Sequence, residues 1–332
     1  MDRQATMEQG LTQAVAAPRL SSAARRRQLR EKAIAGFITL MAFTGIAALL
    51  LIIVFVAKEA LALFMDAEAR HAASLSKMFL AQEGRYPFRW QPVSDTPKVS
   101  MIPLFVGTLK ITFVSMLVSV PLGVFGALFV AEFAPRRLRE LLKPVIELLA
   151  GIPSVVLGFF ALMVLSPVVK DLFHLDRPLN GTLAGLALAL AIVPVIFTVS
   201  EDALTAVPRS YREASLALGA TLWETAWKVV LPAAAPGILA ACVLGFGRAI
   251  GETMIVLMAS GNADLVSWNL GDSARSMSAT IAAEMGEVVV GSTHYSLLFF
   301  IGVELFLFTF VLNMVASAWT KKVLRRLTGS AS

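Results

Sequence analysis

Six long apolar runs, separated by charged segments, constrain this chain more than any other feature of its sequence. A helix of about 20 apolar residues is long enough to cross the hydrocarbon core of a bilayer. The pattern therefore predicts an all-α, polytopic membrane protein with six transmembrane helices. We expect these helices over residues 33–57, 103–131, 144–169, 181–199, 236–258 and 294–319.

The composition excludes a soluble protein, because only 16% of the residues are charged and 57% are hydrophobic. A soluble domain carries about 25% charged residues. The net charge of +6 does not indicate nucleic-acid binding, because the basic residues flank the apolar runs instead of forming one surface. The single cysteine, Cys242, lies inside an apolar run. We therefore expect no intrachain disulfide and no metal or redox cluster.

The distribution of lysine and arginine predicts that both termini are cytoplasmic. With six spans, the two terminal tails share a side with residues 132–143 and 201–232, and together these segments hold 18 of the 29 basic residues. The opposite side holds nine. Positively charged loops stay in the cytoplasm. We expect a basic cytoplasmic tail over 1–32, a first span over 33–57, an extracytoplasmic connector over 58–102, a membrane domain over 103–319 and a cytoplasmic tail over 320–332.

Lys110, Arg248 and Glu252 are charged residues that lie inside predicted spans. Lys110 is near the outer end of the second span and is expected to extend outward along its aliphatic stem. Arg248 and Glu252 are four residues apart, which places them on one face of a continuous helix. Arg248 lies about 18 Å along the helix axis from Pro236, close to mid-membrane. A lone arginine there costs roughly 3 kcal/mol, so the pair indicates a functional site.

The cytoplasmic segment 201–232 carries the most specific motif. Glu213-Ala214-Ser215 is followed by Gly219 and then, after nine intervening residues, by the aliphatic Val229 and by Leu231-Pro232. This spacing resembles the coupling loop of ABC-type importer permeases, with Glu-Ala-Ser in place of Glu-Ala-Ala. The resemblance implies two short helices that dock on a separate ATPase subunit. Gly219 would turn the chain, and Pro232 would end the segment before the next span. An ordinary amphipathic surface helix is the alternative.

Three further stretches narrow the resemblance to the permeases of phosphate-specific ABC importers, and more to the PstC type than to the PstA type. They are residues 148–156, 180–182 and 247–254, the last reading Gly-Arg-Ala-Ile-Gly-Glu-Thr-Met. The likeness covers residue 107 to the C-terminus. It implies the type I importer permease fold for residues 103–319. It also implies a second, PstA-like permease, a PstB-like ATPase dimer that holds ATP and Mg, and an extracytoplasmic PstS-like phosphate-binding protein.

Arg248 and Glu252 have two interpretations. In the first they form a buried ion pair that fixes helix packing, and breaking it costs several kcal/mol. In the second Arg248 faces a translocation path, where its planar guanidinium offers paired donors to a phosphate. Glu252 would then neutralise Arg248 while the path is empty, or accept the proton that phosphate carries.

Pro153 and Ser154 interrupt the third span at about 12 Å depth. A proline can start a half-helix, with Ser154 near its N-terminus, and such N-termini in the membrane suit anions. A simple proline kink is an equally open interpretation.

The chain has no Gly-x-x-x-x-Gly-Lys-Ser/Thr motif and no nucleophile–base set, so we expect a transport subunit without enzyme activity or cofactor of its own. The expected function is the ATP-driven import of inorganic phosphate through the cytoplasmic (inner) membrane. Two alternatives remain, a permease for another oxyanion such as molybdate or sulfate, and a non-conducting membrane sensor or scaffold for phosphate status.

Overall fold

The computed structural model describes residues 22–65, 70, 73–82, 86–94 and 96–328. Most of the predicted N-terminal tail and the last four residues of the predicted C-terminal tail lie outside the described residues. The described part is predominantly helical, and six of its helical runs are long and apolar enough to cross a membrane. The predicted all-α, six-span class is confirmed. The runs are 26–65, 102–133, 154–172, 181–205, 222–251 and 293–322.

The helices and strands follow one another in a simple order, with π-helical turns labelled η. They are α2 (Ser22–Met65), α4 (Leu75–Phe79), β1 (Trp90–Gln91), β2 (Lys98–Val99), α5 (Ile102–Leu128), η1 (Phe129–Phe133), α6 (Arg136–Ala150), α7 (Ser154–Phe160), η2 (Ala161–Leu165), α8 (Ser166–Leu172), α9 (Gly181–Thr205), α10 (Arg209–Ala217), α11 (Leu222–Thr225), η3 (Ala226–Val230), α12 (Leu231–Gly251), α13 (Met254–Ala259), α14 (Met277–Glu284) and α15 (Thr293–Thr328).

The chain divides into two compact units, residues 1–55 and 56–332. In the first unit, the described side chains of α2 are exposed, including a continuous apolar stretch over residues 33–55. An apolar helix of this length needs lipid or protein around it, which fits a membrane span. The second unit contains the remaining spans and all the sites described below.

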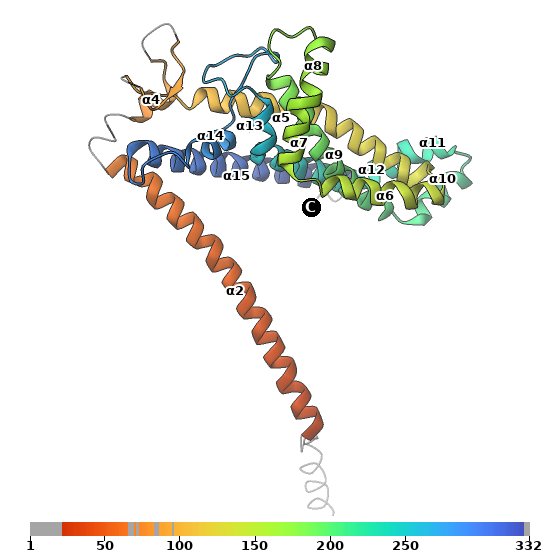
Figure 1. Ribbon diagram of the computed structural model, residues 1–332. Coiled ribbons are helices and arrows are strands. Elements are labelled where there is room, and N and C mark those ends of the chain that lie inside the picture. The colour runs from red at the N-terminus through yellow and green to blue at the C-terminus, as the bar shows by residue number, and fades with distance from the viewer. Residues whose placement is uncertain (1–21, 66–69, 71–72, 83–85, 95, 329–332) are drawn as a thin grey trace, which may run out of the picture. The chain divides into compact units, whose positions relative to one another are not determined.

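The core of the second unit is formed by α5, α9 and α12, which pack against one another (Figure 1). Small residues allow these helices to approach closely. A Cβ atom at Gly185 of α9 would lie 2.5 Å from the Val114 side chain of α5, and one at Gly245 of α12 would lie 2.8 Å from Ile196 of α9. Lipid provides no hydrophobic driving force between helices, so such close packing stabilises the bundle.

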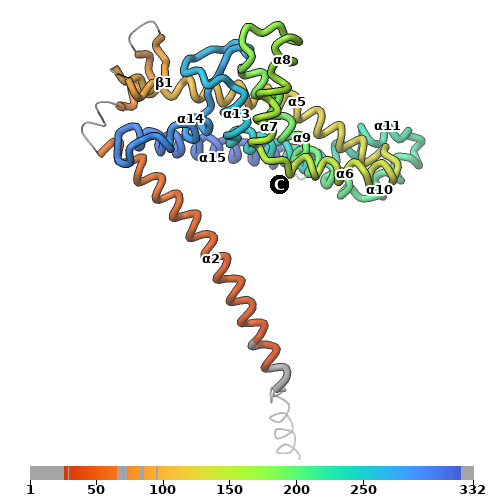
Figure 2. The backbone as a smooth tube through the Cα atoms, in the orientation of Figure 1, coloured from red at the N-terminus to blue at the C-terminus, as the bar shows by residue number. Residues whose placement is uncertain are grey.

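The two ends of the second unit have different structures (Figures 1 and 2). At one end β1 and β2 pair antiparallel, with Trp90 opposite Val99, near α4, α14 and the loop 260–276. At the other end lie the two short helices α10 and α11, joined by a turn. The predicted connector and the predicted coupling segment therefore lie at opposite ends, as alternating spans require. That the α10–α11 end is cytoplasmic remains a prediction from the charge distribution.

Two predicted spans are interrupted by a break in the structure. Residues 144–150, predicted to begin the third span, belong instead to the amphipathic helix α6, and the chain restarts as α7 at Ser154. The break falls at Gly151–Pro153, because Pro153 has no N–H to donate to a preceding turn. The fifth span was predicted to continue to residue 258, but α12 ends at Gly251 and α13 begins at Met254.

Lys110 is buried, in contrast to the outward extension expected from the sequence. Its Nζ donates to the carbonyl oxygens of Ser267, Asn269 and Asp272 at 3.3, 2.9 and 3.1 Å. The loop 260–276 covers the ammonium group and replaces the water it would otherwise reach. The side chain thus anchors this loop to α5.

Candidate functional site

The predicted coupling segment is built as two short helices joined by a tight turn. Gly219 has φ +84°, the left-handed conformation that glycine adopts without strain. Its N–H donates to the carbonyl of Leu216 at 3.0 Å. The helix α11 then begins with a reciprocal capping box between Thr221 and Glu224. The local sequence therefore specifies both the turn and the start of the second helix.

The motif residues on α10 present a largely exposed surface. Glu213 and Ala214 are exposed, and Ser215 is half-buried with its Oγ 2.9 Å from Oγ1 of Thr225. Sequence analysis missed the apolar tip beside them, where Leu218 and Trp223 are 90% and 59% exposed. Exposed apolar residues rimmed by polar ones are typical of a surface that binds another protein.

The sequence led us to expect that Pro232 ends the coupling segment, but it does not. The helix runs from residue 222 through Leu231 and Pro232 to Gly251 without interruption. The π-helical turn η3 ends at Val230, immediately before the first turn of α12 that holds Pro232. A proline in a continuing helix lacks a donor and crowds the carbonyl four residues earlier, and the wider π turn accommodates both effects.

Arg248 lies on the last turn of α12 with an exposed side chain. In the described part of the chain it has no hydrogen bond and no ion pair. The expected pair with Glu252 is absent, because the helix on which both residues would share a face ends between them. A bare guanidinium facing lipid costs roughly 3 kcal/mol, so this side chain requires water or a polar partner in the membrane.

Glu252 lies just before Thr253, the N-cap residue of the next helix. Its backbone is extended, and its Oε1 accepts the N–H of Met254 at 3.2 Å. Its carbonyl oxygen accepts the hydroxyl of Ser278, on α14, at 2.8 Å. A carboxylate at a helix N-terminus is stabilised by the free N–H groups there. Glu252 therefore fixes the break between α12 and α13, four residues after Arg248 in the chain.

The predicted half-helix at Pro153 and Ser154 is present, with Pro153 as the N-cap and Ser154 as the first residue of α7. Helix α7 packs against α13 at Gly158, where a Cβ atom would lie 3.1 Å from the carbonyl oxygen of Met254. The structure thus brings together the two short helices that follow the two breaks. No hydrogen bond joins Ser154 to Arg248 in the described part of the chain.

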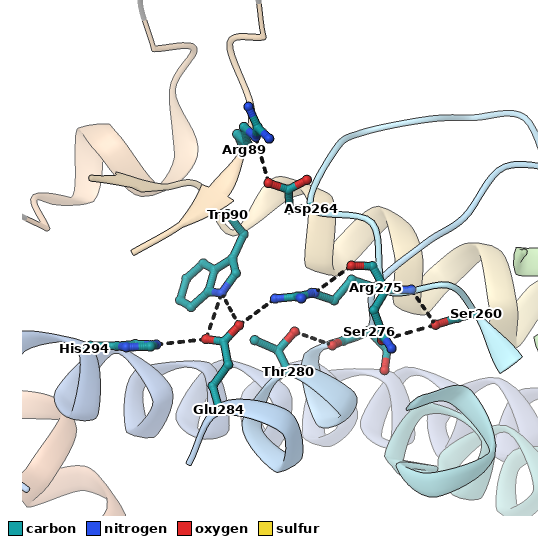
Figure 3. A network of polar contacts seen from close by, with 10 residues as sticks. Arg89, Trp90, Ser260, Asp264, Arg275, Ser276, Thr280, Glu284 and His294 are labelled. Carbon is teal, nitrogen blue, oxygen red and sulfur yellow. Dashed lines mark hydrogen bonds and ion pairs between the residues drawn. The ribbon is translucent and has the colours of Figure 1, made fainter. Parts of the chain in front are cut away.

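A polar network at the end of the unit that holds β1 and β2 was not predicted from the sequence (Figure 3). The carboxylate of Glu284 accepts the indole N–H of Trp90 at 3.1 Å, is paired with Arg275, and lies 2.8 Å from Nε2 of His294. Arg275 also donates to the carbonyl of Asn262. The buried Trp90 thereby ties the connector to α14 and α15.

A second contact joins the connector to the loop 260–276. Arg89 forms an ion pair of 2.7 Å with the side chain of Asp264. The backbone carbonyl of Asp264 also accepts the backbone N–H of Trp90. A cavity of about 710 Å³ lies beside the network and is lined by Val93, Glu287 and Val289 among others. Its carboxylates outnumber its cations, so it is not suited to bind an anionic substrate. The network is best explained as a structural clamp.

Opposing effects set the pKa of Glu284. Burial would raise it, but hydrogen bonds with His294 and Trp90 and the charge of Arg275 together lower the pKa below the ordinary value of about 4.5. Because the pKa of Glu284 is lowered in the folded protein, the clamp contributes its full stability at any pH above the ordinary pKa of a glutamate. That contribution is lost as the pH falls through the lower pKa of the folded protein.

We expect Glu284→Gln to lower stability at pH 7 by about 1–3 kcal/mol, because Arg275 loses its charged partner. Thermal unfolding in detergent measures the effect, and the variant and the parent should converge in acid, where Glu284 is protonated. Glu287→Gln is the matched control, since the Glu287 side chain is exposed. Equal stability of the Glu284→Gln variant and the parent at pH 7 would contradict the clamp.

Comparisons with known proteins agree with this architecture. The model of the family "Binding-protein-dependent transport system inner membrane component" matches residues 119–329. The chain is 36% identical over 294 residues to the probable ABC transporter permease protein YqgH of Bacillus subtilis, which covers 88% of this chain and 92% of that protein. It is 34% identical over 289 residues to the phosphate transport system permease protein PstC of Mesorhizobium japonicum, covering 81% and 86%.

Solved structures show the same fold at low identity. A bacterial alginate ABC transporter in complex with its periplasmic protein matches with a TM-score of 0.58 and 15% identity, over 88% of this chain and 97% of that one. The MetNI methionine ABC transporter matches with a TM-score of 0.51 and 20% identity, over 67% and 94%. The predicted permease fold of an ABC importer is therefore confirmed.

Proposed function

The chain belongs to the family of binding-protein-dependent transport system inner membrane components, and we propose that it is the PstC-type permease subunit of an ATP-driven importer of inorganic phosphate. As a member of this family it is a multi-pass inner-membrane transport component and not an enzyme. Such permeases work with an ATPase and a substrate-binding protein.

The observation that best supports phosphate as the substrate is the environment of Arg248. Its guanidinium is exposed and has no partner among the described residues, although it lies inside an apolar span. A translocation path between this chain and a second permease gives it both water and a ligand. Phosphate loses part of its hydration on entering such a path, and paired N–H donors from one arginine offset that loss. The relatives named for phosphate transport support this substrate.

Glu252 and the Pro153–Ser154 break complete the proposed path. Glu252 follows Arg248 at the end of α12, and its negative charge would weaken phosphate binding at Arg248 so that the anion can leave. The half-helix that begins at Ser154 presents free N–H groups to the membrane interior. In this proposal Arg248 is a transient binding point, and the external binding protein supplies most of the selectivity.

The residues Glu213 to Pro232 would receive the ATPase. The exposed Glu213, Ala214 and Leu218 and the turn at Gly219 form the docking surface, and the helix that continues through Leu231 and Pro232 leads directly into α12. We assign the partners as a PstA-like permease, two copies of a PstB-like ATPase that hold ATP and Mg, and a PstS-like binding protein on the outer face.

Uptake of labelled phosphate by the complex reconstituted in vesicles tests the proposal. We expect uptake that requires ATP and the binding protein and that excess sulfate or molybdate does not reduce. Competition by either oxyanion would instead assign the chain to that substrate. Assembly and regulatory signalling without any uptake would identify a sensor or scaffold.

A further inference from the structure

The helix α10 has little apolar attachment to the rest of the protein. None of its residues, Arg209 to Ala217, is buried. Its outer face is left for a partner, and a helix held only by its ends would move without moving the spans. Some contact other than apolar packing must therefore connect it to the membrane helices.

The side chain of Arg212 makes such a contact with the second and fourth spans. Its Nε and Nη2 reach both carboxylate oxygens of Glu132, at distances between 2.6 and 3.2 Å. Its Nη1 donates to the carbonyl of Val207 at 2.6 Å, and its Nη2 donates to that of Leu204 at 2.9 Å. Glu132 belongs to η1 at the end of the second span, and Leu204 lies in the last turn of α9, the fourth span. One guanidinium thus joins three elements.

The pair is much more buried than the ion pair Arg136–Glu140 on α6. The side chains of Arg212 and Glu132 are 21% and 11% exposed, whereas those of Arg136 and Glu140 are 91% and 61% exposed. Solvent screens exposed pairs so strongly that they contribute little. A planar guanidinium holds a carboxylate and two carbonyls at once, which a lysine ammonium on its flexible stem does not reproduce.

We propose that Arg212 is the positioning residue that transmits the movement of α10 to the second and fourth spans. The inference rests on the proposed function, since it assumes that an ATPase docks on α10. A rigid tie makes the ends of α5 and α9 follow α10 when the ATPase moves it. Without the tie, α10 moves and the path does not open.

The test is the ratio of phosphate imported to ATP hydrolysed by the reconstituted complex. We expect Arg212→Gln to keep the ATPase subunit and to hydrolyse ATP within about twofold of the parent, while phosphate imported per ATP falls about tenfold or more. Glu132→Gln should give the same phenotype, and the double variant should be no worse than either single one, because one interaction is lost in all three.

Arg136→Gln, which breaks an exposed pair on α6, is the matched control and should leave the ratio unchanged. Arg212→Lys should recover part of the ratio through its remaining charge. An unchanged ratio in Arg212→Gln, or loss of the ATPase subunit from the complex, would overturn the proposal.

The test also separates this inference from the proposed function. If the parent complex imports no phosphate but its binding protein still stimulates ATP hydrolysis, phosphate is the wrong substrate. The measurement is then the ratio of ATP hydrolysis with the binding protein to hydrolysis without it, in place of phosphate imported per ATP. Loss of stimulation in Arg212→Gln with retained basal hydrolysis supports the tie, and unchanged stimulation refutes it.

Discussion

Arg248→Gln is expected to abolish phosphate uptake while insertion in the membrane and assembly with the partner subunits stay normal. Glutamine keeps the side chain polar but removes the charge and the paired donors. A hydrogen bond to a charged group contributes about 1.5–3 kcal/mol, so uptake should fall by roughly ten- to a hundredfold or more. Because Arg248 has no partner in the described part of the chain, its loss leaves no group unpaired.

The control for this prediction is Arg137→Gln, which removes an exposed arginine from α6. Labelled phosphate uptake, the amount of the chain in membranes and co-purification of the subunits should all match the parent in the control. If Arg248→Gln reduces membrane protein and uptake in equal measure, the residue fixes packing, and the proposed path is wrong.

Gly219→Val is expected to release the ATPase from the complex. Gly219 has φ +84°, and a residue with a Cβ in the left-handed region costs about 1–2 kcal/mol, with β-branched valine the most strained. The turn that sets α10 against α11 would open, and the docking surface would lose its shape. We expect about a tenfold decrease in the ATPase subunit that co-purifies with the permease.

Gly286→Val is the matched control, since Gly286 is also exposed, a Cβ there meets open space, and its φ is not in the left-handed region. The ATPase should co-purify normally with this variant. Normal co-purification with Gly219→Val as well would exclude the turn from docking. It would then favour an ordinary surface helix over a coupling loop.

Much of the fold could be predicted from hydropathy, because the bilayer forces each apolar run to satisfy its backbone within one helix. The break before Ser154 was visible as a proline in an apolar run. The break at Glu252 was not, because it is stabilised by a carboxylate that accepts the first N–H group of the next helix. Pro232 was wrongly predicted to end the coupling segment, because the sequence does not show the π turn that lets the helix continue through this proline.

The clamp at the connector could not be predicted, because Trp90 and Glu284 are 194 residues apart and neither carries a local pattern. Lys110 was also misplaced, since the loop that covers it comes more than 150 residues later. The candidate site residues were chosen from motifs, and their roles stay predictions. What the structure adds is that Arg248 is exposed and separate from Glu252.

The most direct test of the account is whether water reaches position 248 in the assembled complex. Arg248→Cys in a chain that also carries Cys242→Ser has one thiol, since Cys242 is the only native cysteine. Ala249→Cys, at a buried neighbouring position, is the control. We predict that a charged, membrane-impermeant thiol reagent modifies position 248 and not position 249. Failure to react at 248, combined with reaction with a lipid-soluble reagent, would show that the side chain faces lipid and would contradict the proposed path.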